Sequence, residues 1–250
     1  MCIKKFKLIL LSTLYFFSLS IINAQTLNNQ NTSLKFVTMD LPPYGWIDKQ
    51  GKPHGIIYEL TEEIAKRSGL PYTHKIRPFP RMLTELKIGK VDLISSQAHK
   101  QSLEAGDKLE IQHYIDVITV TKKDSNIQTI KDLKNKNLIY HHNASYKQLE
   151  GLPNKITYIR GYKESLITLY NRQGLDAAVF SEPAYYFWKK KLGLSSNDFG
   201  KVLTIEKNKK QWIFVRKDLP LEIRTKLKKI VEDIRNEGIY ESLLKKYGKD

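Results

Sequence analysis

The stretch LKFVTMDLPPYGWIDKQGKPHGIIYELTEEIAKRSGL, at residues 34–70, decides the class of fold. Its first five residues form a strand-like run, and the apolar residues Ile57, Leu60 and Ile64 then recur at helical spacing. A second short strand-like run at residues 91–94 follows a turn at Gly89. This strand, helix, strand order predicts an α/β fold in which helices pack on a parallel sheet.

The same alternation continues along the rest of the chain. Strand-like runs occupy residues 115–120, 138–140, 156–159, 177–180 and 212–215, and a helical pattern lies around residues 166–170. Ile223, Leu227, Ile230 and Ile234 then mark one apolar face of a long helix, which we expect to end at Glu237-Gly238 before a last helix at residues 239–247. The length allows two α/β units of roughly 100 residues each.

Composition excludes several classes of protein. The 250 residues are 41% hydrophobic and 27% charged, with a formal net charge of +16, and the mean hydropathy is −0.44. These values rule out a disordered chain and a membrane protein with many spans. The basic excess gathers in residues 120–211, which hold 17 Lys and Arg against 8 Asp and Glu. Because these residues are dispersed, we expect a solvated basic surface and no nucleic-acid partner.

The N-terminus has the pattern of a secretory signal. Three lysines precede an apolar run at residues 8–17, and Ala24 offers a cleavage site before Gln25. We therefore expect residues 1–24 to be a signal peptide and residues 25–33 a flexible tail. The only cysteine, Cys2, lies inside the signal without a lipobox. The mature chain is thus expected in the periplasm, without a lipid anchor, a thiol or a disulfide.

Several motifs, in their order and spacing, resemble the family 3 extracellular solute-binding proteins, the periplasmic amino-acid-type receptors of ABC transporters. They are residues 36–46 (FVTMDLPPYGW), 51–70, 86–96 (LKIGKVDLISS), 129–138 (TIKDLKNKNL), 174–183 (GLDAAVFSEP), 212–220 (WIFVRKDLP) and 236–248 (NEGIYESLLKKYG). The resemblance implies a periplasmic-binding-protein-like (type II) α/β fold with two lobes and a ligand cleft between them. Residues 34–119 and 212–250 would form the first lobe and residues 120–211 the second, with hinge strands near residues 118–121 and 210–212.

The loop after the first predicted strand is a candidate for one wall of the cleft. Pro42 and Pro43 cannot continue a strand ladder, so they hold the chain extended and present Tyr44. Ligands of open α/β sheets bind beyond the carboxyl ends of the strands, which makes Tyr44 and Trp46 candidate ligand contacts. The alternative is that both rings pack against the neighbouring loop.

Two further candidate ligand-binding segments would lie in the first lobe. Ser95, Ser96 and Gln97 follow the strand at residues 91–94 and would place polar groups at its carboxyl end, unless the serines cap the next helix. Arg81 lies just inside a helix that begins near Pro80. It matches a position where some family members carry an arginine that faces the cleft, and its guanidinium could bind a carboxylate or phosphate. Alternatively Arg81 pairs with Glu85.

In the second lobe, the segment HHNASY at residues 141–146 follows a strand, and Asn143, Ser145 and Tyr146 are candidate ligand contacts. The two adjacent histidines suggest a metal only weakly, because no carboxylate lies near them in the sequence. Glu182 lies where the resemblance implies an acidic residue that holds a ligand ammonium group, although Ser181 could occupy that position. Glu182 could instead stabilise a helix N-terminus.

One departure from the family concerns the ligand. Amino-acid receptors of this family carry an arginine after the serine segment, and it binds the α-carboxylate, whereas this chain reads QAHKQSLEAG at residues 97–106. His99 or Lys100 could substitute for that arginine. The resemblance therefore implies a small polar ligand, either an amino-acid-like zwitterion or another small anion.

The resemblance also implies how the protein acts. It would be a monomer without a cofactor that captures its ligand by closure of the lobes and presents it to an ABC permease or a membrane sensor. The alternative is a lyase on the same fold, similar to cyclohexadienyl dehydratase, in which Glu182 with His99 or His141 would be the acid and base.

Overall fold

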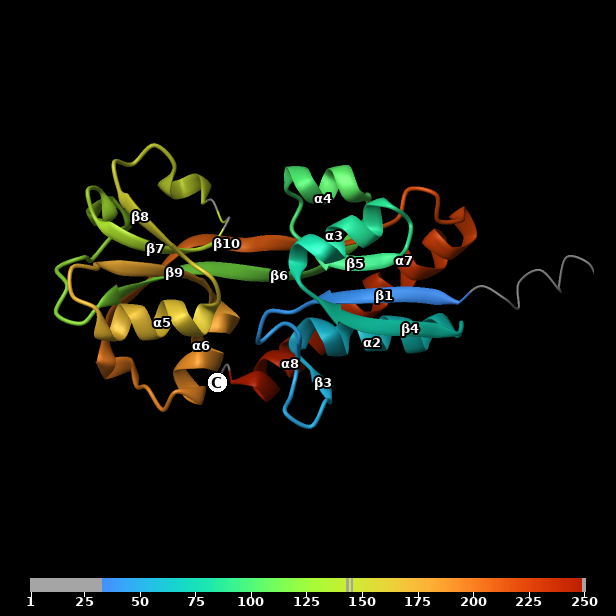
Figure 1. Ribbon diagram of the computed structural model, residues 1–250, viewed down its shortest axis with the longest axis horizontal. Coiled ribbons are helices and arrows are strands. Elements are labelled where there is room, and N and C mark those ends of the chain that lie inside the picture. The colour runs from blue at the N-terminus through green and yellow to red at the C-terminus, as the bar shows by residue number, and fades with distance from the viewer. Residues whose placement is uncertain (1–32, 143, 145, 249–250) are drawn as a thin grey trace, which may run out of the picture.

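The chain forms two α/β lobes that share one continuous sheet (Figure 1). The computed structural model describes residues 33–142, 144 and 146–248; the predicted signal and nearly all of the predicted tail lie outside the described residues. The eight strands of the sheet follow the order β4-β1-β5-β10-β6-β9-β7-β8. No helix of the described residues is long and apolar enough to span a bilayer.

The elements alternate along the chain much as the sequence pattern predicts. The strands are β1 (Leu34–Met39), β2 (Trp46–Ile47), β3 (Pro53–His54), β4 (Tyr72–Arg77), β5 (Leu93–Ser96), β6 (Asp107–Lys122), β7 (Asn137–His141), β8 (Lys155–Ile159), β9 (Ala177–Ser181) and β10 (Phe199–Val215). The α-helices are α2 (Ile56–Ser68), α3 (Phe79–Lys87), α4 (Lys100–Ala105), α5 (Tyr162–Asn171), α6 (Glu182–Lys191), α7 (Leu221–Asn236) and α8 (Ile239–Tyr247). Three short 3₁₀ helices are η1 (Ile130–Leu133), η2 (Lys147–Leu149) and η3 (Ser196–Asp198).

The first lobe is built on three parallel strands. β1 pairs in parallel with β4 on one side and with β5 on the other. One face packs against α2, α7 and α8 in a core that includes Leu60, Ile64 and Ile234, and the other face contacts α3 in a second core around Met82 and Phe214. The helical spacing predicted for α2 and α7 is thus confirmed, since it is their apolar stripes that are buried.

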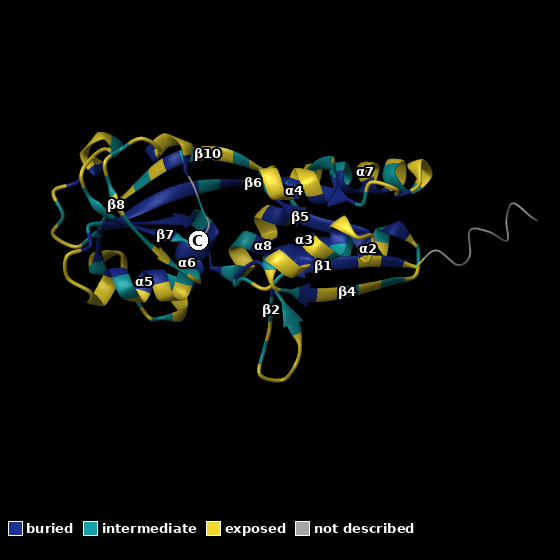
Figure 2. Ribbon diagram, turned by 45° about the horizontal axis from the view of Figure 1, so that its top comes forward, coloured by how far each residue is buried: buried dark blue, intermediate teal, exposed yellow. Residues whose placement is uncertain are grey.

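The second lobe repeats this plan. β7 pairs in parallel with β8 and with β9. α5 and α6 cover one face of the sheet, where Phe180 and Tyr185 are buried. The other face lies under the segments of η1 and η2, with Leu133 and Leu149 in the core. Figure 2 shows β7 and β9 of this lobe as mainly buried, whereas β8 at the edge of the sheet and the outer surfaces of the helices are partly exposed.

Two long antiparallel strands, β6 and β10, join the lobes. They pair with each other from Asp107↔Val215 to Lys122↔Phe199. β10 meets β5 of the first lobe at residues 212–215, and β6 meets β9 of the second lobe at residues 117–121. The stretch that crosses between lobes is therefore 112–116 on β6 and 207–211 on β10. The predicted hinge residues 118–121 already pair within the second lobe.

The sequence pattern underestimated both crossing strands. Only the apolar runs at residues 115–120 and 212–215 were predicted as strands, whereas β6 and β10 are 16 and 17 residues long. The additional residues are largely polar, because a strand that crosses between lobes lacks a continuous apolar core on either face. The sheet is accordingly mixed rather than purely parallel.

Candidate functional site

The carboxyl ends of two pairs of parallel strands meet between the lobes, and the two pairs run in opposite directions. β1 and β5 end there from the first lobe, and β7 and β9 end there from the second. Ligands of open α/β sheets bind beyond such ends. The loops that follow these strands carry most of the residues that the sequence singles out, including Tyr44, Gln97, Tyr146 and Glu182. Asn143 and Ser145 lie outside the described residues.

A direct hydrogen bond joins the lobes at this place. The hydroxyl of Tyr44 donates to Oγ of Ser181 at 2.5 Å, although the two residues lie 137 positions apart in the chain. Tyr162 also lies near Ser181, and this proximity partly offsets the rise that burial causes in the pKa of Tyr162. Burial raises the pKa of Tyr44 well above its ordinary value, and the nearby Tyr162, Tyr240 and Tyr146 add to this effect. Tyr44 therefore stays protonated and keeps its donor at physiological pH.

The backbone around Tyr44 depends on one glycine. The carbonyl oxygen of Tyr44 accepts from the backbone N–H groups of Ile57 and Tyr58 at the start of α2. Gly55 has φ of 130°, and a Cβ atom there would lie 2.3 Å from that carbonyl oxygen. Only glycine adopts this conformation without strain.

We expect Gly55→Ala to lower the free energy of unfolding by about 2 kcal/mol, because the Tyr44 loop must shift to accommodate the new methyl group. Chemical denaturation measures the loss. Gly51→Ala is the matched control, since Gly51 also has positive φ but no atom lies within 4 Å of its would-be Cβ. Equal losses in the two variants would contradict the role of the close approach.

Trp46 packs between elements of both lobes. Its ring stacks on His54 at 5.5 Å and contacts Phe187 of α6 at 5.5 Å and Tyr247 of α8 at 5.6 Å. Trp188 strengthens the same contact, because its indole N–H donates to the carbonyl oxygen of Pro42 at 3.3 Å. The ring of Trp46 thus packs against aromatic residues of both lobes, which goes beyond the packing on the neighbouring loop that the sequence left open.

Three other candidates have partners inside the first lobe. Ser95 is buried, and its hydroxyl donates to Oε1 of Gln112 at 2.6 Å. The hydroxyl of Ser96 lies 2.8 Å from that of Ser102 in α4. Arg81 pairs with Glu85 at 2.8 Å, and its side chain is 63% exposed. Arg81 thus has the partner that was its alternative to ligand contact, whereas the two serines bond to other side chains and the cap of α4 is His99.

A hollow of about 460 Å³ lies beside the crossing strands. It is lined by Gln97, Ala98, His99, Trp212 and residues 206–210 of β10. Lys209, one of the lining residues, places its ammonium group 6.0 Å from the ring centroid of Tyr146 in the second lobe. The hollow therefore lies at the carboxyl end of β5 and near the loop that follows β7.

Acidic side chains gather near Tyr240 of α8. The pKa of Tyr240 is raised mainly by burial, and the carboxylates of Glu241, Glu182 and Asp116 add to the shift. Glu182 is the first residue of α6 and follows Ser181 directly. The predicted acidic residue thus lies near the junction of the lobes, within electrostatic range of Tyr240.

Sequence reasoning missed a set of buried polar groups on the crossing strands. Gln112, His113 and Gln211 are at most 7% exposed. Both ring nitrogens of His113, the amide nitrogens of both glutamines and the hydroxyl of Tyr240 have no hydrogen-bond partner among the described residues. Burial lowers the pKa of His113 to about 3, so the ring is neutral. A polar run inside a long strand was the signal that could have drawn attention to these residues.

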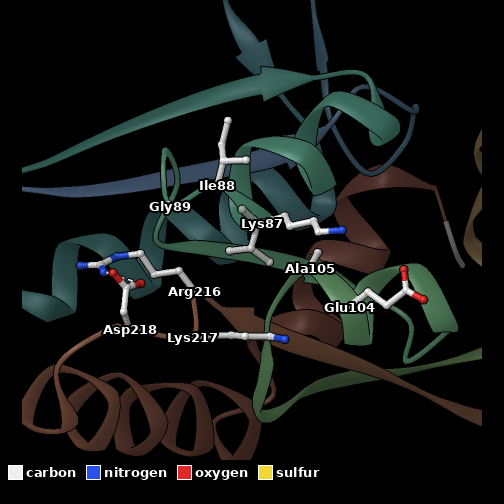
Figure 3. A pocket seen from close by; sticks show the side chains of 9 residues that line it. Lys87, Ile88, Gly89, Glu104, Ala105, Arg216, Lys217 and Asp218 are labelled. Carbon is white, nitrogen blue, oxygen red and sulfur yellow. Dashed lines mark ion pairs between the residues drawn. The ribbon is translucent and has the colours of Figure 1, made fainter.

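A second hollow, shown in Figure 3, lies at the opposite end of the first lobe. Its lining residues come from the end of α3, the end of α4 and the turn after β10. Arg216, which lines it, is engaged in ion pairs with Asp92 and Asp218. Because this hollow lies at the amino end of β5, it is not part of the junction between the lobes.

The histidines considered as metal ligands or as bases have other neighbours. The ring of His141 lies 5.1 Å from that of Tyr162, and Nδ1 of His99 accepts from the backbone N–H of Ser102 at 3.2 Å. Burial lowers the pKa of both histidines. Within residues 33–142, 144 and 146–248, no group of three potential metal ligands comes together.

Comparison with known proteins identifies the family of the chain and a relative. The sequence profile of the bacterial extracellular solute-binding proteins, family 3, matches residues 34–250. A Bacillus subtilis (strain 168) protein named "Probable amino-acid-binding protein YxeM" is 28% identical over 208 residues, which cover 80% of this chain and 77% of that protein.

Many solved structures share the fold, and two of them illustrate it. One is a substrate-binding protein of an ABC uptake transporter from Streptococcus pneumoniae with bound histidine, with a TM-score of 0.69, 22% identity, and coverage of 88% of this chain and 94% of that one. The other is a histidine kinase sensor domain with similarity to periplasmic binding proteins, with a TM-score of 0.67, 22% identity, and coverage of 88% and 97%. Both are type II periplasmic binding folds, and at this identity they show the fold alone.

Proposed function

The chain belongs to the bacterial extracellular solute-binding proteins, family 3, and from that premise we propose that it captures a small amino-acid-like ligand between its lobes and delivers it to an ABC permease. The Bacillus subtilis relative, by its name, binds an amino acid. The carboxyl ends of β1, β5, β7 and β9, which face one another, would form the binding cleft.

The contact between Tyr44 and Ser181 is the observation that carries this proposal. The two hydroxyls belong to different lobes and lie at the ends of β1 and β9. A ligand that touches both lobes binds the closed form more tightly than the open form, and it shifts the population by that difference in affinity. Closure would therefore convert ligand binding into a surface that a membrane partner recognises.

The charges near the crossing support a zwitterionic ligand. Carboxylates of Glu182 and Asp116 lie close to Tyr240, whereas lysines line the hollow beside β10. The ammonium group of a ligand would be attracted to these carboxylates, and its carboxylate to the lysines. The residues that we propose as ligand contacts are Tyr44, Gln97, Tyr146 and Glu182, together with Asn143 and Ser145.

The proposal includes export of the protein and a membrane partner that receives the ligand. Removal of residues 1–24 would release the protein outside the cytoplasmic membrane, as its family is extracellular. A permease is the favoured partner, since the resemblance is to receptors of ABC transporters. Because one structural neighbour is the sensor domain of a histidine kinase, a membrane sensor is the other partner to test.

Titration calorimetry against the common L-amino acids, together with small-angle scattering with and without the best ligand, tests the proposal. We expect at least one amino acid to bind and to make the protein more compact. Turnover of prephenate or arogenate by the purified protein, or a shape that ligand does not change, would contradict it.

Tyr44→Phe sharpens this test. We expect the affinity for the best ligand to fall about fivefold, because a hydrogen bond worth about 1 kcal/mol no longer stabilises the closed form. Tyr158→Phe removes a hydroxyl from a ring that is 55% exposed on β8, the last strand of the sheet, and should leave the affinity unchanged. Equal effects of the two variants would remove Tyr44 from the closure mechanism.

A further inference from the structure

The hollow beside β10 has a strongly basic lining. Lys207, Lys209 and Lys210 contribute to it, and Glu206 is the acidic residue in that lining. Trp212 forms another part of the wall, with the ammonium group of Lys108 4.7 Å from its ring centroid. We propose that this hollow binds the anionic part of the ligand and that the protein selects a ligand of net negative charge, an acidic amino acid or a related dicarboxylate. This inference rests on the proposed function and specifies its ligand.

Lys207 and Lys209 lie at a β-bulge in β10, and Lys210 follows it. The pairing of β10 with β6 shifts between Glu206↔Val117 and Lys209↔Ile115, so two residues of β10 bulge out opposite Asp116. Asn208 in the bulge has φ of 52°, and its backbone N–H donates to Oδ1 of Asp116 at 2.8 Å. A bulge re-aims side chains and bends the strand that carries it. Here it brings lysines to the crossing between the lobes.

Lys209 is held between the lobes. Its ammonium group pairs with Glu206 at 2.9 Å, and its side chain is 21% exposed. The same group lies over the ring of Tyr146, which follows β7 in the second lobe. Lys207 and Lys210 are exposed and form no ion pair within the described residues. A bound carboxylate would therefore find one positioned ammonium group and two that are available to it.

The two residues that the sequence suggested in place of the family arginine are less suited. His99 lines the hollow, but burial lowers its pKa, so it carries no positive charge at neutral pH. Its Nδ1 is already an acceptor for the N–H of Ser102. Lys100 begins α4, is exposed and does not line the hollow. The β10 lysines are thus the cations that face this space.

The test compares four probes by titration calorimetry: L-glutamate, L-glutamine, L-arginine and glutarate. The three amino acids share their α-groups and differ in side-chain charge, and glutarate lacks the ammonium group. We expect L-glutamate to bind at least tenfold more tightly than L-arginine, with an affinity that falls as salt rises. Lys209→Ala and Lys210→Ala should each weaken L-glutamate about tenfold, which is the effect of a lost charged hydrogen bond of about 1.4 kcal/mol.

Lys155→Ala is the matched control, since Lys155 is exposed at the start of β8 and its loss changes the net charge equally. Preference for L-arginine, or equal effects of all three lysine variants, would overturn the inference while amino-acid binding stood. Lysine-dependent binding of glutarate without binding of any amino acid would support the inference and refute an amino-acid-like ligand. Failure of all four probes to bind would count against the inference.

Discussion

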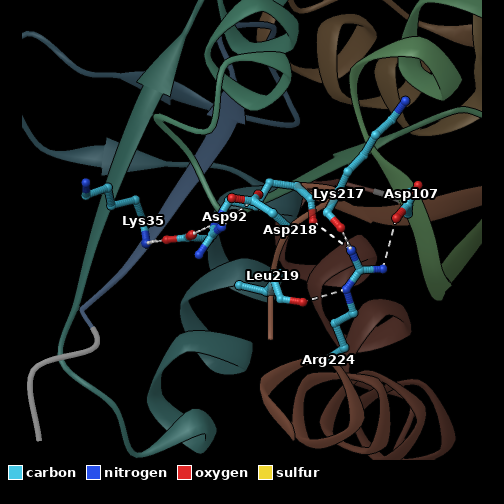
Figure 4. A network of polar contacts seen from close by, with 8 residues as sticks. Lys35, Asp92, Asp107, Lys217, Asp218, Leu219 and Arg224 are labelled. Atoms are coloured by element: carbon cyan, nitrogen blue, oxygen red, sulfur yellow. Dashed lines mark hydrogen bonds and ion pairs between the residues drawn. The ribbon is translucent and has the colours of Figure 1, made fainter. Parts of the chain in front are cut away.

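Asp92→Ala should lower the free energy of unfolding by about 3 kcal/mol, the cost of removing one partner from a largely buried ion pair. Asp92 lies just before β5, and its carboxylate contacts the two strands on either side of β5; its contact with Lys35 is seen in Figure 4. One oxygen accepts from the backbone N–H of Lys35 in β1 at 2.7 Å. The other accepts from Nε of Arg216, just after β10, at 2.5 Å. The variant leaves both donors without this acceptor.

Chemical denaturation of Asp92→Ala and Asp218→Ala measures the difference. Asp218 also pairs with Arg216, at 2.7 Å, but its side chain is 78% exposed, against 10% for Asp92. Water screens exposed pairs, so Asp218→Ala should cost less than about 1 kcal/mol. If the two variants lost the same stability, burial of the Asp92 carboxylate would not be the source of the effect.

His113 should make the protein sensitive to acid. Its side chain is 2% exposed and packs 4.2 Å from the ring of Tyr240. Burial lowers its pKa to about 3, whereas an unfolded chain has a histidine pKa of about 6.5. Between these values the unfolded state binds a proton that the folded state does not. The stability from neutral His113 is therefore complete above pH 6.5 and is lost as the pH falls, by about 3 kcal/mol at pH 4.5.

His113→Phe isolates this contribution, because phenylalanine keeps a flat ring and does not titrate. Burial lowers the pKa of His99 and His141 as well, so both proteins should lose stability in acid. We expect the wild type to lose about 3 kcal/mol more than the variant between pH 7 and pH 4.5. Denaturant titrations at the two pH values give the four free energies needed. Equal losses would show that His113 is not buried as a neutral ring.

Predictions that depended on local pattern were confirmed. The apolar stripes of α2 and α7 are buried, and α7 gives way to α8 at Glu237 and Gly238, as the pattern predicted. Helical and strand periodicity is set by which side of an element faces the core, so it can be recognised in a short window. The family resemblance likewise depended on motifs that are each contiguous.

In the candidate site, too, contacts between residues close in the sequence could be predicted, whereas contacts between distant residues could not. Arg81 and Glu85 lie four residues apart on one helix, and their pairing was an alternative visible in the sequence. The partner of Tyr44 could not be predicted from the sequence, because Ser181 is 137 residues away and no local pattern links the two residues. The bulge that carries Lys209 exists only against the register of β6.

The sequence by itself thus determined the alternation of most strands and helices, although not β2, β3 or β4, as well as the family and the segments that carry the candidate residues. The tertiary structure alone decided which of these side chains meet, how long the crossing strands are, and that His113 is buried without a partner among the described residues. The physical reason is that strand pairing and lobe contact join residues that lie far apart along the chain. Burial, and with it the charge state of His113, follows only from that assembly.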